Sequence, residues 1–303
     1  MISFFYEAAR KAKALNRPYW RLIYKINKGM VNLFYPIRQK FGKAYGLDEN
    51  SRIIVSLTTY PVRVSTVWIT AASLLCQTLK PFKVILWLAE EQFPEHKIPY
   101  SLEKMKRRGL EVRFCTDLKP HKKYFYAMKE YPDYYIITAD DDIFYPENHI
   151  KQLWDGYEKY PGNIVCQWSH RIGFTEQGAF QPYNEWADNA EEEPSYATLA
   201  VGCGGVLYPP DSLASETFDE RKIEKYSLFT DDLWLKCMEI LHEKKVVNCN
   251  RTALIYFNNI MTMKSGLWTH NTGQGQNNDM VWKRLTGLYP EVKKRLLKER
   301  AHE

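Results

Sequence analysis

The sequence predicts an α/β protein with a mostly parallel sheet that helices cover on both faces. From residue 52 onward, short β-branched apolar segments alternate with segments of helical periodicity. The first of these apolar segments, residues 52–58, is typical of a buried strand. The 303 residues, with 45% hydrophobic and 26% charged side chains, are enough for one large globular domain or two small ones.

The expected elements follow one another along the chain. Helices and strands alternate up to the middle of the sequence, and a helix of residues 102–108 should end at Gly109, a typical C-cap residue. Residues 170–199 lack a clear period and predict a long excursion over the surface. The other strands are expected at residues 83–88, 110–114, 134–142 and 163–168, and the other helices at residues 65–77, 124–131, 150–160, 231–244 and 280–300.

The N-terminal part differs in charge from the rest of the chain. Residues 1–46 carry ten basic side chains and one acidic side chain, a net charge of +9, which leaves −3 for the remainder of a chain with a total of +6. We therefore expect an amphipathic helical extension at residues 1–48 and a separate domain at residues 49–303. The apolar positions recur at helical spacing and the basic positions fall opposite: Tyr19, Ile23, Ile26, Met30 and Leu33 against Arg17, Arg21, Lys25 and Lys28.

Two hypotheses account for this extension. A basic amphipathic segment rich in aromatic residues can lie on an anionic membrane surface. It can equally pack on the domain or on another subunit and expose its basic face to water. No apolar run approaches the roughly 20 residues that span a bilayer, and no signal-peptide pattern is present. We expect a cytoplasmic protein, with peripheral attachment to the inner face of the cell membrane under the first hypothesis.

The six cysteines carry no recognisable framework. They lie at positions 76, 115, 166, 203, 237 and 249, without a C-x-x-C pair. This spacing favours reduced thiols in a cytoplasmic protein over disulfides or a zinc site.

An apolar run that ends in three carboxylates is the central feature of the sequence. Asp140, Asp141 and Asp142 close the strand expected at residues 134–142. In an extended chain Asp140 and Asp142 would point to one side and Asp141 to the other. Two carboxylates on one side form half of an oxygen site for Mg²⁺ or Mn²⁺, and ligands of open α/β sheets lie at the carboxyl ends of strands. A solvated acidic turn is the alternative.

Two other segments carry groups suited to anions or nucleotides. The first strand runs into Thr58, Thr59, Tyr60 and Arg63, where an aromatic ring could stack on a base and a guanidinium could hold phosphate. Lys122 and Lys123 stand just before a helix, which suits an anion site, although a solvated basic turn explains them as well.

The second half of the chain adds three motifs. A glycine-rich loop that includes Gly204 and Gly205 permits a close approach of backbone to a ligand, or a tight packing turn. Asp231 and Asp232 begin a helix, where one carboxylate could accept a proton or serve as a cap. His270 lies in a polar, glycine-rich segment and is a candidate metal ligand.

In this order, the motifs resemble those of GT-A fold glycosyltransferases, in particular the bacterial polysaccharide type related to family 2. The resemblance covers about residues 52–275. It rests on residues 53–63 as first strand and nucleotide loop, residues 139–142 as the D-x-D motif, residues 202–208 as the sugar-side loop, and residues 230–234 in the place of the catalytic E-D pair.

The resemblance implies a metal-dependent, inverting transfer of a sugar from a nucleotide-diphosphate sugar, with a UDP-sugar favoured. Asp142 would be the main ligand of Mn²⁺ or Mg²⁺, with Asp140 toward the metal or ribose, Asp141 beside them and His270 as a further ligand. Asp232 would be the general base; because the pair is Asp-Asp here, Asp231 is the alternative. The acceptor would be a glycan or a lipid-linked molecule in cell-surface polysaccharide biosynthesis.

Two other functions fit part of the sequence. A sugar-1-phosphate nucleotidyltransferase shares a related core, but those enzymes carry a glycine-rich loop after the first strand, where this chain has Thr58–Pro61. A non-enzymatic basic protein that binds membrane or nucleic acid would explain the N-terminal charge. It would not explain the acidic motifs, and we expect no nucleic-acid partner.

Overall fold

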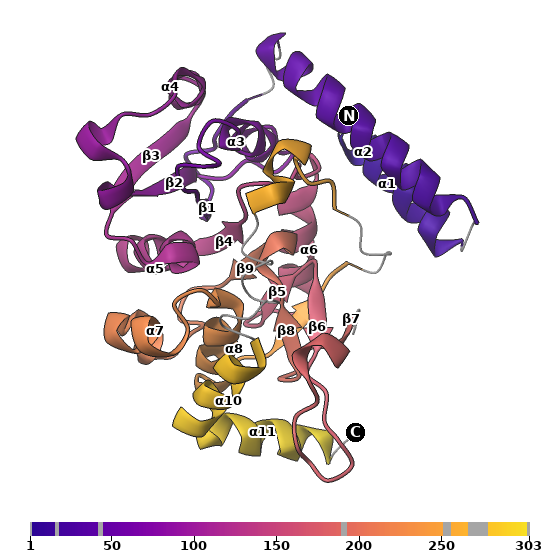
Figure 1. Cartoon of the computed structure of the whole chain (residues 1–303), viewed down its shortest axis with the longest axis vertical. Helices are drawn as coiled ribbons and strands as arrows, with labels where there is room; N and C mark the ends of the chain where they lie inside the picture. The colour runs from indigo at the N-terminus through magenta and orange to yellow at the C-terminus, as the bar shows by residue number, and fades with distance from the viewer. Residues whose placement is uncertain are drawn as a thin grey trace.

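The computed structural model describes residues 2–15, 18–41, 45–188, 193–250, 256–265 and 278–301. This part of the chain has the α/β architecture that the sequence predicts, with a seven-stranded sheet in the order β10-β5-β9-β4-β1-β2-β3 (Figure 1). The strands pair in parallel except where β9 meets β4 and β5. They are β1 (Ile53–Thr58), β2 (Lys83–Ala89), β3 (Leu110–Cys115), β4 (Tyr135–Ala139), β5 (Ile164–Cys166), β9 (Val206–Tyr208) and β10 (Val246–Asn248).

Strand β1 lies in the middle of this sheet, between β2 and β4. Leu57 is opposite Ala139 in the parallel register, so β1 and β4 end at the same edge. The segments that follow these two strands therefore leave the sheet side by side. This places the loop after Thr58 next to the acidic residues that follow Ala139.

Alternate residues of the strands pack on opposite faces of the sheet. Val55 and Leu57 share a core with α3 (Val67–Leu75), α4 (Tyr100–Lys106) and α6 (His149–Lys159). Ile54 points to the other face, where Ala127 of α5 (Lys122–Glu130) belongs to the same cluster. The sheet is thus buried on both faces, as the apolar strands predict.

The N-terminal residues form a pair of helices that shares a core with the domain. Helices α1 (Ile2–Ala14) and α2 (Trp20–Phe41) lie side by side (Figure 1). The sequence predicted an amphipathic helical extension, and the structure divides it into these two helices. Their inner side chains join three residues of the domain in one apolar cluster: Ile2, Tyr6, Ala9, Val31 and Tyr35 with Ile69, Phe144 and Phe257. The division of domains at residue 48 stays a prediction.

Glu147 fixes the first turn of α1 to the domain. Its carboxylate accepts hydrogen bonds from the backbone N–H groups of Ile2 and Ser3, at 3.0 and 2.8 Å, and from Ser3 Oγ at 2.6 Å. Burial opposes the charge of Glu147, but the hydrogen bonds from the amino end of α1 lower its pKa to about 2. A carboxylate at a helix N-terminus satisfies free N–H groups and the helix dipole, so this contact orients the helical pair.

Two segments differ from the sequence-based expectations. Part of residues 170–199, expected as an irregular excursion, belongs to a second, antiparallel sheet of β6 (Ser169–Arg171), β7 (Ala187–Asp188) and β8 (Thr198–Ala200). Strands of two or three residues are too short to show a period in the sequence. The single C-terminal helix is two helices, α10 (Asn278–Leu288) and α11 (Pro290–Arg300), because proline interrupts one helix and suits the start of the next.

Two further findings concern the cysteines and the character of the helices. All six cysteines are free thiols, as the sequence predicts. Within the described ranges, no helix combines the length and the apolar character needed to cross a membrane.

The stability of the fold should fall at mildly acidic pH because of His149. This side chain is fully buried, and burial lowers its pKa to about 3. An unfolded histidine, with a pKa near 6.5, takes up a proton as the pH falls below that value, whereas the folded one does not. The unfolded state then binds more protons, and the free energy of unfolding should fall by about 2 kcal/mol between pH 7 and pH 5 through this group.

Urea unfolding of the wild type and of His149→Leu at both pH values measures this effect. The variant should lose about 2 kcal/mol less than the wild type between the two pH values. Equal losses would mean that His149 is not the source of the acid sensitivity.

Candidate active site

The candidate site lies at the edge of the sheet where β1 and β4 end. The loop after β1 supplies Thr59 and Arg63, and the turn after β4 supplies the three aspartates. Helix α5 supplies Lys123 from the same side, and α8 (Asp231–Leu241) begins with the second acidic pair. Four motifs that are distant in the sequence therefore meet at one edge of the sheet, as expected for ligand sites of open α/β sheets.

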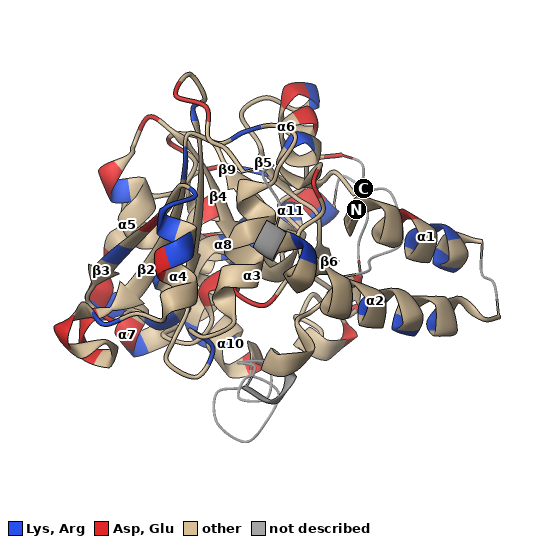
Figure 2. Ribbon diagram, turned by 90° about the horizontal axis from the view of Figure 1, so that it is seen from above, with Lys and Arg blue, Asp and Glu red and all other residues tan. Residues whose placement is uncertain are grey.

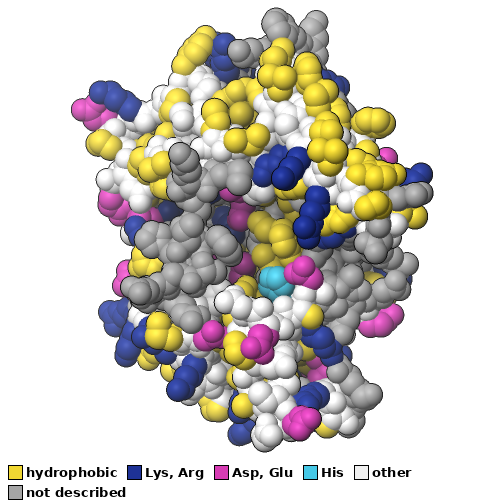
Figure 3. Space-filling model, turned by 45° about the vertical axis from the view of Figure 1, so that its right-hand side comes forward, with side chains coloured by type: hydrophobic (Ala, Val, Ile, Leu, Met, Phe, Trp, Pro, Cys, Tyr) yellow, Lys and Arg dark blue, Asp and Glu magenta, His cyan; other side chains and the backbone are white. Residues whose placement is uncertain are grey.

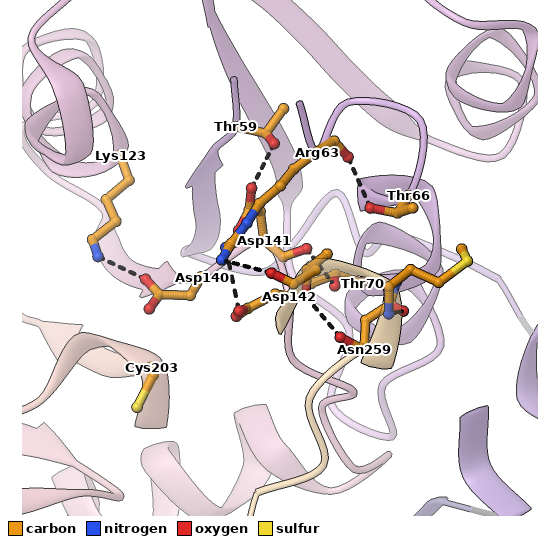
Figure 4. Close-up of polar contacts among 12 residues, drawn as sticks. Thr59, Arg63, Thr66, Thr70, Lys123, Asp140, Asp141, Asp142, Cys203 and Asn259 are labelled. Carbon is orange, nitrogen blue, oxygen red and sulfur yellow. Dashed lines mark hydrogen bonds and ion pairs between the residues drawn. The ribbon is translucent and has the colours of Figure 1, made fainter. Parts of the chain in front are cut away.

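Arg63 and Asp141 form the buried centre of the site (Figure 4). The Arg63 Nη1 atom lies 2.6 Å from Asp141 Oδ1 and 3.2 Å from Asp142 Oδ2. The other oxygen of Asp141 accepts a hydrogen bond of 2.5 Å from Thr59 Oγ1, and the Asp141 carbonyl accepts one of 2.9 Å from Thr70 Oγ1. Asp141 thus joins the β1 loop, helix α3 and the β4 turn, and has a clear structural role.

The three aspartates have different partners, which corrects one expectation. The strand ends at Ala139, earlier than predicted, and Asp141 and Asp142 lie in a turn. The alternation of an extended chain therefore does not apply here. Asp141 and Asp142 both contact Arg63, whereas Asp140 contacts Lys123, at 2.8 Å from its Nζ atom.

The acidic cluster has an excess of negative charge in a buried place. Burial and, after it, the charge of the neighbouring Asp141 raise the pKa of Asp142 to about 7, against the effect of Arg63. Burial also raises the pKa of Asp141, although Arg63 and Thr59 oppose the change. A carboxylate that is costly to ionise in this way favours the binding of a further cation.

Lys123 connects the two acidic motifs. Its Nζ atom lies 2.8 Å from Asp140 Oδ1 and 2.9 Å from Asp231 Oδ2, and its side chain is only 5% exposed. Burial opposes the positive charge, but Asp140, Asp231 and Asp232 together raise the pKa of Lys123 well above its usual value. The ammonium group is therefore held between the end of β4 and the start of α8.

Asp232 faces the glycine-rich loop. The backbone N–H of Gly202 lies 3.2 and 3.3 Å from the two carboxylate oxygens of Asp232. A Cβ atom at Gly202 would lie only 2.9 Å from Lys123 Nζ and 3.0 Å from Asp232 Oδ1, and 3.7 Å from Asp140 Oδ1. The loop can approach these three charged groups only because residue 202 has no side chain.

The pKa values of the two aspartates in the second acidic pair are shifted in opposite directions. Burial would raise the pKa of Asp231, but Lys123 and then His121 lower it. Burial raises the pKa of Asp232 well above its usual value, and the charge of Asp231 adds to this effect. Asp231 is thus a paired anion, and Asp232 is the carboxylate with the higher affinity for a proton.

Several expected binding residues are engaged elsewhere. Thr58 donates its hydroxyl hydrogen bond to the Trp87 carbonyl of β2, at 2.9 Å, and Lys122 is buried in an ion pair with Asp117. Tyr60 lies beside Arg63, whose guanidinium carbon is 5.7 Å from the ring centroid.

The two predicted glycines of the loop pack closely against neighbouring side chains. A Cβ atom at Gly204 would lie 2.6 Å from Trp168 Cβ, and one at Gly205 would lie 2.4 Å from His149 Nε2. Their N–H groups donate to Val201 and Gly202 within the loop. The glycine that faces the acidic groups is Gly202, which the sequence alone did not distinguish from its neighbours.

The structure describes two of the three residues that were expected to bind a metal ion, Asp140 and Asp142. His270 lies outside the described residues. Among the residues that the structure describes, no three His, Cys, Asp or Glu side chains converge closely enough to hold a metal ion by themselves.

The segment that contains Asn259 and Thr262 contacts the site, although no sequence pattern predicted these contacts. The Asn259 N–H donates to the Asp142 carbonyl at 2.7 Å, and the Thr262 carbonyl lies 3.5 Å from Arg63 Nη2. Polar residues in an irregular segment give no sequence signal for such contacts.

Comparisons with known proteins give a distant structural similarity. No protein-family model matches the chain, and no curated protein sequence matches it. Residues 1–349 of S. aureus TarS are similar at 14% identity and a TM-score of 0.41, with 66% of this chain and 59% of that chain covered. The same protein has been solved with UDP and with UDP-GlcNAc, at TM-scores of 0.40 and 0.39 and identities of 13% and 11%.

A second solved structure is similar to about the same extent. It is CMP:2-keto-3-deoxy-manno-octonic acid synthetase complexed with CTP, at 8% identity and a TM-score of 0.36, with 64% of this chain and 86% of that chain covered. For TarS, the chain spans about three fifths of the length of the structures it matches. Identities and TM-scores as low as these do not decide between functions.

Replacement of Arg63 by alanine should destabilise the protein strongly. The substitution leaves two buried carboxylates without their cation, and the loss of one partner of a buried ion pair typically costs about 3 kcal/mol or more. Chemical denaturation measures the free energy of unfolding, with Lys151→Ala in the exposed ion pair with Asp155 as a control that should change little. Adding Asp141→Asn to Arg63→Ala should restore part of the loss. A normal stability of Arg63→Ala would contradict the central role of this pair.

Proposed function

We propose that this chain is a glycosyltransferase that moves a sugar from a nucleotide-diphosphate sugar to a hydroxyl group of an acceptor. The observation that carries this proposal is the convergence at one sheet edge of Asp140 and Asp142, of Lys123, and of Asp232 against Gly202. Asp140 and Asp142 are suited to bind a cation together with donor phosphates, and Asp232 is suited to accept a proton. A UDP-sugar is the favoured donor, by the resemblance stated above.

The acidic cluster suits a divalent cation, Mn²⁺ or Mg²⁺. Asp142 is costly to ionise without a further positive charge, and Asp140 keeps about a third of its side chain exposed. We infer that Asp140 and Asp142 would hold the cation together with donor phosphates, while His270 stays a candidate ligand by resemblance alone. When bound, the cation would stabilise the negative charge of the departing diphosphate.

Asp232 is the proposed general base. Its raised pKa makes its carboxylate a stronger proton acceptor than an ordinary aspartate, which suits it to deprotonate the acceptor hydroxyl. The hydroxyl oxygen then forms a bond to the anomeric carbon as the bond to the diphosphate breaks, which inverts the configuration. Lys123 would keep Asp231 ionised and hold the base in place, so Asp231 is a positioning residue in this proposal.

The donor is proposed to bind over the β1 loop. Tyr60 and Arg63 offer an aromatic ring and a guanidinium there. Four other residues were also expected at the donor: Thr58, Lys122, Gly204 and Gly205. They bond or pack against other residues, so we propose that they support the site without contacting the donor. The acceptor is proposed to be a glycan or a lipid-linked molecule in cell-surface polysaccharide biosynthesis, and the location to be cytoplasmic.

A sugar-1-phosphate nucleotidyltransferase is the second candidate. The similarity to a synthetase that binds CTP is as weak as that to TarS. The β1 loop offers hydroxyls, a ring and Arg63 where the resemblance to that class would require glycines. Release of pyrophosphate from a nucleoside triphosphate and a sugar phosphate would decide for this alternative.

Donor binding should depend on the metal and on Asp142. Thermal shift measured with a panel of nucleotide sugars should show stabilisation by one donor class with Mn²⁺ or Mg²⁺, and little with EDTA. Asp142→Ala should abolish that shift, whereas Asp155→Ala, which removes an exposed carboxylate on α6, should keep it. Binding that ignores both the metal and Asp142 would overturn the proposed site.

The two aspartates of α8 should separate in their kinetics. Asp232→Asn should lower kcat by a factor of about 10² to 10⁴ with little change in donor affinity, as for the loss of a general base. Asp231→Asn removes a partner of Lys123 and should change donor affinity as well as kcat. Steady-state kinetics with the donor found above measure both, and an unchanged kcat of Asp232→Asn would exclude it as the base.

A further inference from the structure

Helix α2 exposes an apolar stripe along most of its length. Six of its large side chains are at least 38% exposed, and they recur at spacings of three or four residues, with Leu33 and Phe34 adjacent: Leu22 59%, Ile26 53%, Met30 38%, Leu33 58%, Phe34 43% and Ile37 48%. From Leu22 to Ile37 the stripe is about 22 Å long. The inner face of the same helix already packs on the domain through Val31 and Tyr35. The exposed stripe is therefore not the face that holds the helix to the protein.

Helix α2 also contacts a segment that reaches the candidate active site. The side-chain amide of Asn32 donates to the Asn258 carbonyl at 3.1 Å, and its oxygen accepts from the Ile260 N–H at 2.9 Å. Ile260 and Met261, next to that contact, are 50% and 71% exposed. Residue 259 of the same segment bonds to the backbone of Asp142. Ile260 and Met261 are thus exposed apolar residues in a segment that contacts both α2 and the acidic cluster.

Basic side chains accompany the stripe. On the helical wheel of α2, Arg21 and Lys25 lie on one side of the stripe and Arg38 on the other, and all three are exposed. Figure 2 shows Lys and Arg along both α1 and α2. Figure 3 shows hydrophobic side chains gathered on the upper part of the molecule, with Lys and Arg beside them.

We propose that this surface, defined as the exposed stripe of α2 with Ile260 and Met261, binds an anionic lipid membrane. An apolar stripe with basic flanks is typical of helices that lie in the plane of a bilayer interface. The net charge of +9 in residues 1–46 attracts an anionic surface, whereas a second copy of the chain would bring an equal positive charge against it. This proposal does not depend on the catalytic proposal, but it places the site next to the lipid.

Vesicle co-sedimentation of the full chain tests this surface. With vesicles of 70% phosphatidylcholine and 30% phosphatidylglycerol, the wild type should sediment, and at least tenfold less strongly with pure phosphatidylcholine. The double variant Ile26→Glu and Leu33→Glu should bind the anionic vesicles at least tenfold more weakly. The control Tyr100→Glu replaces an exposed aromatic residue on α4, away from the stripe, and should bind like the wild type.

Further measurements distinguish membrane binding from loss of folding and from dimer formation. Circular dichroism and the donor-induced thermal shift should be unchanged in the double variant, so that a failure here is distinguished from a failure of the proposed function. The double variant Arg21→Gln and Lys25→Gln should lose most of the preference for anionic vesicles. A wild type that stays in the supernatant, or a double glutamate variant that binds normally, would overturn the proposal. A wild-type dimer that becomes a monomer in the glutamate variant, measured by light scattering, would also overturn it in favour of a second copy.

Discussion

The buried ion pair between Arg63 and Asp141 is the interaction on which the site depends. A charge removed from water is tolerated only when it is paired and hydrogen-bonded, and Asp141 meets this condition through Arg63, Thr59 and Thr70. These three partners come from the β1 loop and helix α3. The pair therefore fixes the turn that carries Asp140 and Asp142, the two carboxylates that we propose as ligands of the cation.

Lys123 plays the corresponding role on the other side of the site. It lies between Asp140 and Asp231, and so holds the start of α8 near the end of β4. One cation cannot neutralise both carboxylates together with Asp232, whose pKa is raised by burial and then by the charge of Asp231. The site thus contains one well-paired aspartate in each acidic motif, Asp141 and Asp231. Each stands next to one that is poorly compensated, Asp142 or Asp232, and these two are the residues to which we assign the proposed chemistry.

The sequence predicted the mostly parallel central sheet, the positions of its first strands along the chain and the charged residues at the ends of those strands. These features depend on runs of apolar residues and on charges at their ends, which local patterns reveal. It did not separate the roles of neighbouring residues. Gly202, Gly204 and Gly205 look alike in the sequence, but only the fold sets Gly202 against Asp232 and Lys123. The contact of Asn259 with Asp142 depends on a tertiary approach across more than a hundred residues, which no local pattern encodes.

For the N-terminal helices, the sequence predicted an apolar face but did not show whether that face is buried. Helical spacing predicted an apolar face, and such a face normally packs inward. In the structure, α2 packs through Val31 and Tyr35, while Ile26 and Leu33 remain in water. Exposing that much apolar surface in one stripe is unfavourable for an isolated protein, so it indicates a surface that is covered in use. Because Asn32 links this helix to the segment that contacts Asp142, we infer that whatever covers the stripe would also lie near the candidate active site.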